Sequence, residues 1–157
     1  MAFIPEGAKW YLAEIVNEIT VEGDPRNVVH TNLVLVRADP PNEAYEKALD
    51  LGKGGETFFQ NPAGKRVDIK FFGLHSLNVI YDELEHGAEL SFHEKISMRA
   101  EELRKWIRPK EKLAVFAAIK PSSGPDYASG DIVREALDML HTLRPDSSRH
   151  ERNDNES

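Results

Sequence analysis

Two histidines and two glutamates that lie close together in the sequence are the residues best suited to hold a metal ion. Glu85, His86, His93 and Glu94 offer imidazole nitrogens and carboxylate oxygens, which are ligands of zinc and of other divalent metals. His93 is in phase with the polar side chains of an expected strand, and His86 lies beside a turn glycine, so the four side chains need not converge. We therefore predict surface positions for Glu85, His86 and His93, with weak potential as metal ligands, and no cofactor.

His75 is the histidine whose position matters most for catalysis. It continues the inward phase of the apolar residues from Val67 to Phe71, provided that Gly73 introduces no bulge. We expect a core histidine hydrogen-bonded to the backbone in preference to a catalytic base. One alternative function rests on this region, namely a small metal-dependent hydrolase or nuclease that uses histidines and carboxylates between His75 and Glu94.

The glycine-rich and serine-rich stretches favour structural roles. Gly52-Lys53-Gly54-Gly55 follows an expected helix and precedes a strand, whereas a phosphate loop lies between a strand and the start of a helix. No base is evident beside Ser122-Ser123-Gly124 or Ser129-Gly130. We interpret the first stretch as a helix end and the others as a loop and a helix cap.

Carboxylates on strand faces carry the main functional prediction. Glu14, Glu18 and Asp68 occupy the outward phase of expected strands, where water screens their charges. An acidic sheet face is better suited to binding a basic protein than to acid–base catalysis, which needs carboxylates whose pKa values burial has separated. These three residues are our candidate partner-binding residues, and no catalytic residue is assigned.

Charge is distributed unevenly along the 157 residues, whose net charge is -7. Residues 1–98 hold 9 basic and 16 acidic side chains, and residues 99–144 hold 9 basic and 7 acidic ones. General nucleic-acid binding is disfavoured, because that affinity comes largely from clustered Lys and Arg. The concentrated positive stretch contains Arg99, Arg104, Lys105, Arg108, Lys110 and Lys112.

The composition is that of a cytoplasmic globular protein. The chain is 40% hydrophobic and 30% charged, and no window has the roughly 20 apolar residues that a membrane helix needs. It has no cysteine, which excludes disulfides, a cysteine nucleophile and cysteine-ligated metals. The first twenty residues do not resemble a secretion signal, so we expect a cytoplasmic location.

The first 98 residues predict an α+β fold, with a mainly antiparallel sheet and one helix packed on a face. Alternation indicates a strand over 11–21, and four consecutive apolar residues, 33–36, indicate a central strand covered on both faces. A helix is expected over 41–51, with Asp39 as N-cap and Gly52 at its end. A hairpin of 57–60 with 65–74, a helical turn over 82–86 and a strand over 88–98 complete the set.

Helical spacing replaces alternation after Met98. A short helix is expected over 100–107, and the apolar segment 113–119 should be buried as a strand or a helix. A final helix, capped by Ser129 or Asp131, should bury a stripe formed by Ile132, Ala136, Leu140 and Leu143. We therefore expect an α+β domain over 9–98, a small helical C-terminal module over 99–144 and a disordered tail over 145–157.

Several short motifs resemble a bacterial family catalogued as domain of unknown function 4288, over about residues 9–98. The resemblance implies a small cytoplasmic protein. Some members occur near toxin and defence genes, which implies an immunity or antitoxin role, and no family catalytic residues can be carried over. The motifs are Trp10-Tyr11-Leu12-Ala13, the helix from Glu43 to Gly52, Val67-Asp68-Ile69-Lys70-Phe71-Phe72-Gly73 and Tyr81-Asp82-Glu83-Leu84.

The leading hypothesis from the sequence is a non-enzymatic binding protein, of the immunity or antitoxin type, that masks a basic protein with its acidic sheet face. The metal-dependent hydrolase or nuclease is the second hypothesis. A third is a structural or regulatory subunit that docks another chain through its last helix, and a homodimer is compatible with each.

Overall fold

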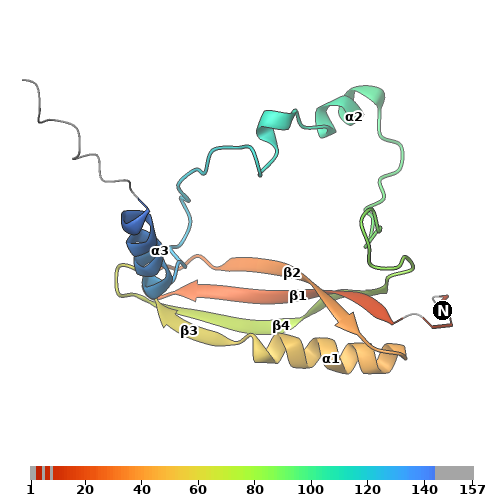
Figure 1. The fold of residues 1–157 in the computed structure, drawn as a ribbon, viewed down its shortest axis with the longest axis horizontal. Helices are drawn as coiled ribbons and strands as arrows, with labels where there is room; N and C mark the ends of the chain where they lie inside the picture. The colour runs from red at the N-terminus through yellow and green to blue at the C-terminus, as the bar shows by residue number, and fades with distance from the viewer. Residues whose placement is uncertain (1–2, 5, 8, 144–157) are drawn as a thin grey trace, which may run out of the picture.

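The computed structural model describes residues 3–4, 6–7 and 9–143, and its centre is a four-stranded antiparallel sheet. The strands are β1 (Trp10–Val21), β2 (Val28–Arg37), β3 (Thr57–Gln60) and β4 (Arg66–Val79), in the order β2-β1-β4-β3. The helix α1 (Pro41–Gly54) packs on one face of this sheet (Figure 1). The predicted α+β class is confirmed.

The long strand β1 lies at the centre of the sheet and follows the predicted alternation. Ala13, Ile15, Ile19 and Val21 are buried, while Glu14, Glu18 and Thr20 are half-buried on the opposite side. The core between the sheet and α1 is small, since the helix contributes Ala44 and Ala48 to it. Small helical side chains allow the helix to approach the sheet closely.

The helix α1 is longer than the sequence predicts, and its caps differ. Pro40 rather than Asp39 is the N-cap, without a side-chain cap hydrogen bond; the Asp39 N–H instead donates to Glu43 Oε2 at 3.4 Å. Gly52 does not end the helix, which continues to Gly54. It is a buried contact residue, because a Cβ at this position would overlap the ring of Phe71.

The prediction that residues 33–36 form a central strand covered on both faces is wrong. β2 is an edge strand paired with β1 alone, and Leu33 and Leu35 remain 60% and 42% exposed. Val34 and Val36 pack toward α1. Four consecutive apolar residues therefore supply both faces, but within the described residues α1 covers only one of them.

Two irregularities in β4 overturn the prediction that His75 lies in the core. The register against β1 shifts between Glu14 and Ile15 and again between Val16 and Asn17, so that Phe72 and His75 have no partner in β1. Leu74 takes the inward position, and His75 is exposed. The prediction required that Gly73 introduce no bulge, but Gly73 has φ +152° and lies between the two bulged residues, Phe72 and His75. The bulges thus keep the later residues of β4 in the core phase.

The predicted helical turn over 82–86 and strand over 88–98 are absent. Residues 81–98 form bends and turns with no partner in the sheet, and Phe92 and Ile96 are exposed. The segment begins where the Ile80 N–H donates to the Trp10 carbonyl at 2.9 Å, the last sheet contact of β4. Alternation favours an extended backbone, but a strand also needs a neighbour, and none lies beside these residues.

The C-terminal region contains α2 (Ala100–Trp106), the short 3-10 helix η1 (Lys110–Lys112) and α3 (Gly130–Thr142). Ser129 caps α3 as predicted, accepting a hydrogen bond from the Ile132 N–H at 3.4 Å. The predicted burial of 113–119 is wrong, since Val115 is 85% exposed and Ile119 is fully exposed. The α3 stripe is exposed as well, and the predicted tail 145–157 lies outside the described residues. Local signals form these helices, whereas burial requires a tertiary partner.

The chain returns to the sheet just before α3. Arg26 Nη1 donates to the Ser123 carbonyl at 3.0 Å, and Asn61 Nδ2 donates to the Asp126 carbonyl at 2.9 Å. Between Ile80 and this return the chain forms a wide arc, which passes above the sheet in Figure 1 while α1 lies below it. We call residues 99–120 of this arc the arm. In the part of the chain that the structure describes, no helix is long and apolar enough to cross a membrane.

Candidate functional site

The first of two candidate surfaces is the face of the sheet opposite α1, which we call the open face. Glu14 and Glu18 of β1 lie on it, and each is flanked in register by an apolar residue of β2 and a polar residue of β4. The surface is therefore mixed, with acidic groups beside exposed hydrocarbon. Its flanking residues are Leu33 and Ser76 beside Glu14, and Val29 and Lys70 beside Glu18.

The two glutamates are held in place by neutral groups. Ser76 Oγ donates to Glu14 Oε2 at 2.7 Å, and Asn27 Nδ2 donates to Glu18 Oε2 at 2.9 Å. Neither carboxylate takes part in an ion pair with the described residues. Four residues along a strand separate them by roughly 13 Å. The open face thus presents two positioned negative charges that a cationic partner can neutralise.

Asp68, the third predicted partner-binding residue, is already paired. Its carboxylate contacts the Arg66 guanidinium at 3.0 Å, and that guanidinium also lies over the Phe58 ring, 4.2 Å from the centroid. The hydrogen bonds from Arg66 lower the pKa of Asp68. Because the neighbouring cation offsets this charge, the unpaired acidic groups of the face are Glu14 and Glu18.

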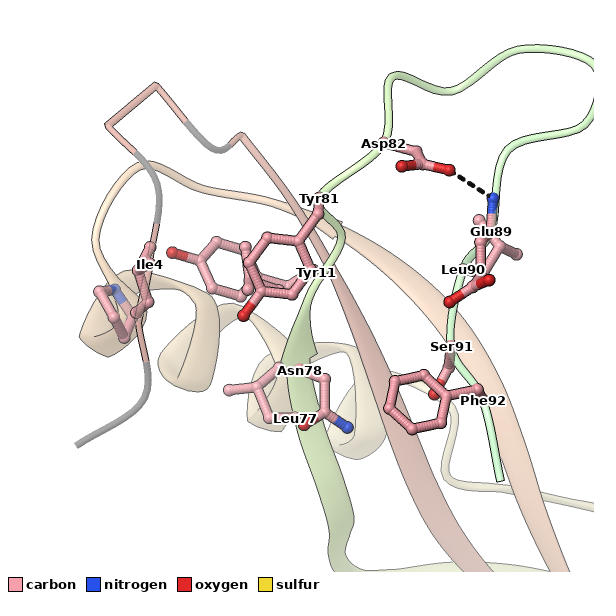
Figure 2. Close-up of a pocket in the computed structure, with 12 residues that line it drawn as sticks. Ile4, Tyr11, Leu77, Asn78, Tyr81, Asp82, Glu89, Leu90, Ser91 and Phe92 are labelled. Carbon is pink, nitrogen blue, oxygen red and sulfur yellow. Dashed lines mark hydrogen bonds between the residues drawn. The ribbon is translucent and has the colours of Figure 1, made fainter. Parts of the chain in front are cut away.

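The second candidate surface is a cavity of about 470 Å³ at the end of the sheet where β4 leaves it (Figure 2). Leu77 and Val79 supply apolar wall, and Tyr81, Asp82 and Phe92 come from the segment that follows β4. Asp82 Oδ2 accepts a hydrogen bond from the Glu89 N–H at 2.9 Å, which holds the loop across the cavity (Figure 2).

Tyr11 is the buried polar group of this cavity. Its hydroxyl donates to the Asp39 carbonyl at 2.9 Å. Burial raises the pKa of Tyr11, and the nearby charges of Asp39 and Glu43 raise it further. The phenol therefore remains protonated at neutral pH and acts as a hydrogen-bond donor. The lining includes Ser91 but no histidine or lysine, so the cavity is suited to holding a ligand group rather than to activating a nucleophile.

A comparison with known protein families matches residues 10–91 to the family described as Domain of unknown function (DUF4288). The chain belongs to this family. The match spans all four strands, α1 and most of the residues that line the cavity, and it ends before the arm. Searches of curated proteins and of solved structures gave no match.

The structure does not gather the weak metal-ligand candidates of the sequence into a site. Glu85, His86, His93 and Glu94 are exposed in the segment after β4. Among the residues that the structure describes, no three His, Asp or Glu side chains lie close enough together to hold a metal ion. These four side chains therefore lie at the surface and do not converge on a common point.

Sequence analysis missed two features of the DUF4288 domain. The first is the exposed apolar part of the open face. The run of apolar residues in β2 leads to the prediction that these side chains are buried. The second is the cavity, whose residues come from the N-terminal segment, β1, α1, β4 and the loop after β4. One signal was present: Tyr81-Asp82 comes directly after Ile80, the residue that follows β4, where a strand would end in a polar turn.

Proposed function

We propose that the DUF4288 domain is a protein-binding module whose open face receives a basic protein surface. The observation that carries this proposal is the pair Glu14 and Glu18, two carboxylates without an ion-pair partner among the described residues, set beside the exposed side chains of Val29, Leu33 and Leu35. The family resemblance implies an immunity or antitoxin role, and we propose that a binding module of this kind would act in that role in the cytoplasm.

The two kinds of group on the open face have different tasks. Exposed carboxylates attract a cationic partner and orient its approach, so they act mainly on the association rate and on its salt dependence. Apolar side chains supply affinity when they leave water, at roughly 25 cal/mol per Å² of buried area. A partner with basic residues around an apolar centre would satisfy both.

Charge reversal on the open face tests the proposal. The variant Glu14→Lys, Glu18→Lys should keep its fold, because neither side chain belongs to a core cluster, but it should lose the partner that the wild-type chain captures from its host cells. The matched control is Glu46→Lys, Asp50→Lys, which makes the same charge change on exposed positions of α1.

The partner is then purified, and its association is measured at low and high salt. We expect the open-face variant to associate at least tenfold more slowly at low salt, with the difference shrinking as salt rises. Equal losses in the two variants would show that net charge matters and that the open face does not. Unchanged binding in the open-face variant would contradict the proposal.

A further inference from the structure

We infer that the basic surface received by the open face is the arm of a second copy of this chain, so that two copies exchange arms in a symmetric dimer. This inference rests on the proposed function of the open face and names its partner. Three properties of the arm support it: its charge, its exposed apolar side chains and its attachment to the sheet.

The arm carries the charge that the open face lacks. Residues 99–120 hold seven basic and three acidic side chains. Two of the acidic residues form ion pairs within α2, Arg99 with Glu102 at 2.7 Å and Lys105 with Glu101 at 3.4 Å. Arg104 and Arg108 form no ion pair with the described residues. Among the described residues, the arm therefore presents cations without an ion-pair partner, as the open face presents carboxylates without one.

The arm also exposes more hydrocarbon than a solvated segment normally does. Its large apolar side chains are exposed, and none of them belongs to either core cluster of the sheet. Large apolar side chains exposed along one segment are typical of an interaction surface. The residues with the greatest exposure are Trp106, Ile107, Val115, Phe116 and Ile119.

Together the two surfaces are large enough for a specific interface. Complete burial of a Val, Leu, Ile, Phe or Met side chain corresponds to about 60–120 Å² of area. Each arm exposes six such side chains (Leu103, Ile107, Leu113, Val115, Phe116 and Ile119), and each open face exposes three. Across two copies they offer an area on the order of 1,000 Å², which reaches the size of a specific interface.

The attachment of the arm explains why its own open face is left uncovered. The arc that contains the arm is fixed at one end by the Ile80 N–H bond to Trp10 and at the other by the Arg26 and Asn61 bonds to residues 123 and 126. Between these points it bows away from the sheet (Figure 1). A two-fold axis lets each arm cover the other copy's open face, so both complementary surfaces are satisfied by one symmetric contact.

Mixing two charge-reversed chains tests the exchange. One variant reverses the open face, Glu14→Lys with Glu18→Lys, and the other reverses the arm, Arg104→Glu with Arg108→Glu. In sedimentation velocity we expect the wild-type chain to be a dimer, and each variant alone to dissociate with a Kd raised at least tenfold. An equimolar mixture should recover the dimer, because each arm of the mixed pair then meets a face of opposite charge.

Three results would overturn the inference. The first is a wild-type chain that stays monomeric at every concentration. The second is a wild-type dimer that neither pair of substitutions weakens, which would place its interface elsewhere. The third is an equimolar mixture of the two variants that stays monomeric, although a single chain carrying all four substitutions sediments as the wild-type chain does. Such a result would mean that the arm closes on the sheet of its own chain.

The same variants separate this inference from the proposed function. A monomeric wild-type chain that still binds a basic protein, and loses it in the Glu14→Lys, Glu18→Lys variant, overturns the dimer and leaves the open face as a binding surface. If reversal of the open face changes neither self-association nor binding to any captured protein, the proposed function fails as well. The control Glu46→Lys, Asp50→Lys should sediment as the wild-type chain does.

Discussion

At the scale of single residues, the close contact between Gly52 of α1 and the Phe71 ring of β4 fixes how near the helix lies to the sheet. The sequence places a glycine near the end of a helical pattern, which predicts a helix end. The contact with Phe71 cannot be predicted this way, because it joins residues 19 positions apart whose relation depends on the register of β4.

We predict that Gly52→Ala destabilises the domain by about 1–3 kcal/mol, as overpacking of a tight contact does. The matched control is Gly54→Ala in the same helix, where an added Cβ meets no atom within 4 Å. This control should be neutral or stabilising by up to about 1 kcal/mol, because alanine favours the helix. Urea unfolding of the two variants measures the difference, and equal stabilities would show that α1 does not approach the sheet this closely.

Asp24 provides a pH-dependent contact beside the return of the chain. Hydrogen bonds from Arg26 lower the pKa of Asp24 from 3.8 to about 2. The same guanidinium donates to the Ser123 carbonyl, so Asp24 orients the group that holds the end of the arc. The folded state prefers the ionised carboxylate, and the stabilisation is therefore complete above the ordinary pKa and is lost as pH falls toward 2.

We predict that the melting temperature of the wild-type chain falls more steeply between pH 4 and pH 2 than that of Asp24→Asn, which lacks the titrating group. Thermal melting followed by circular dichroism across this range measures the two slopes. Protonation of Asp24 at the acidic end of this range should also weaken the attachment of residues 123–126, which would appear as faster amide hydrogen exchange in that segment. Identical slopes in both chains would show that the Asp24–Arg26 pair contributes nothing to folding.

At the scale of elements, β4 shows where sequence patterns stop being sufficient. The alternation from Val67 to Phe71 predicts one inward face correctly, and the hairpin with β3 follows from Asn61-Pro62-Ala63-Gly64. Beyond Phe71 two extra residues enter the strand, and each one reverses the phase. A bulge depends on how a strand pairs with its neighbour. The pattern of one strand can therefore indicate that a bulge is possible near Gly73, but it cannot locate the register shift.

The neighbours Leu74 and His75 test this register directly. We predict that Leu74→Ala destabilises the domain by about 2 kcal/mol, since Leu74 packs against the core, whereas His75→Ala changes stability by less than about 0.5 kcal/mol, as at an exposed site. Chemical denaturation of both variants gives the comparison. The reverse order would place His75 in the core and restore the unbulged strand.

The strand β2 and the helix α3 also show what sequence patterns cannot predict. An apolar run such as Leu33 to Val36, or a stripe such as that of α3, predicts that the side chains seek cover. The sequence does not specify whether the cover comes from the same chain or from another one. In this fold α1 packs on one face of the sheet, and the described residues leave Val29, Leu33 and Leu35 of the second face and the α3 stripe exposed.

At the scale of the whole molecule, the sheet domain carries the excess of acidic residues and the arm carries an excess of basic ones, and both expose apolar side chains. The sequence predicts this division of charge, and it predicts Glu14 and Glu18 on the outward side of β1. It does not predict that the acidic face is also apolar, which follows from the edge position of β2. These two properties together support the proposal that the open face is a binding surface and that the arm of a second copy occupies it.

The most direct test of this account is hydroxyl-radical footprinting of the unmodified chain over a range of concentrations. At concentrations where the chain is associated, we predict protection of Val29, Leu33 and Leu35 on the open face and of Trp106 and Phe116 on the arm. Tyr45 and Leu51, which are exposed on α1, should react equally at all concentrations and serve as internal references.

Dilution or high salt should then expose the open-face and arm residues together, because one contact protects both sets. Joint loss of protection, with the α1 residues unchanged, is the result that the account predicts. Open-face side chains that react at the same rate in associated and dilute samples would contradict it, since the surface would then be free of any partner.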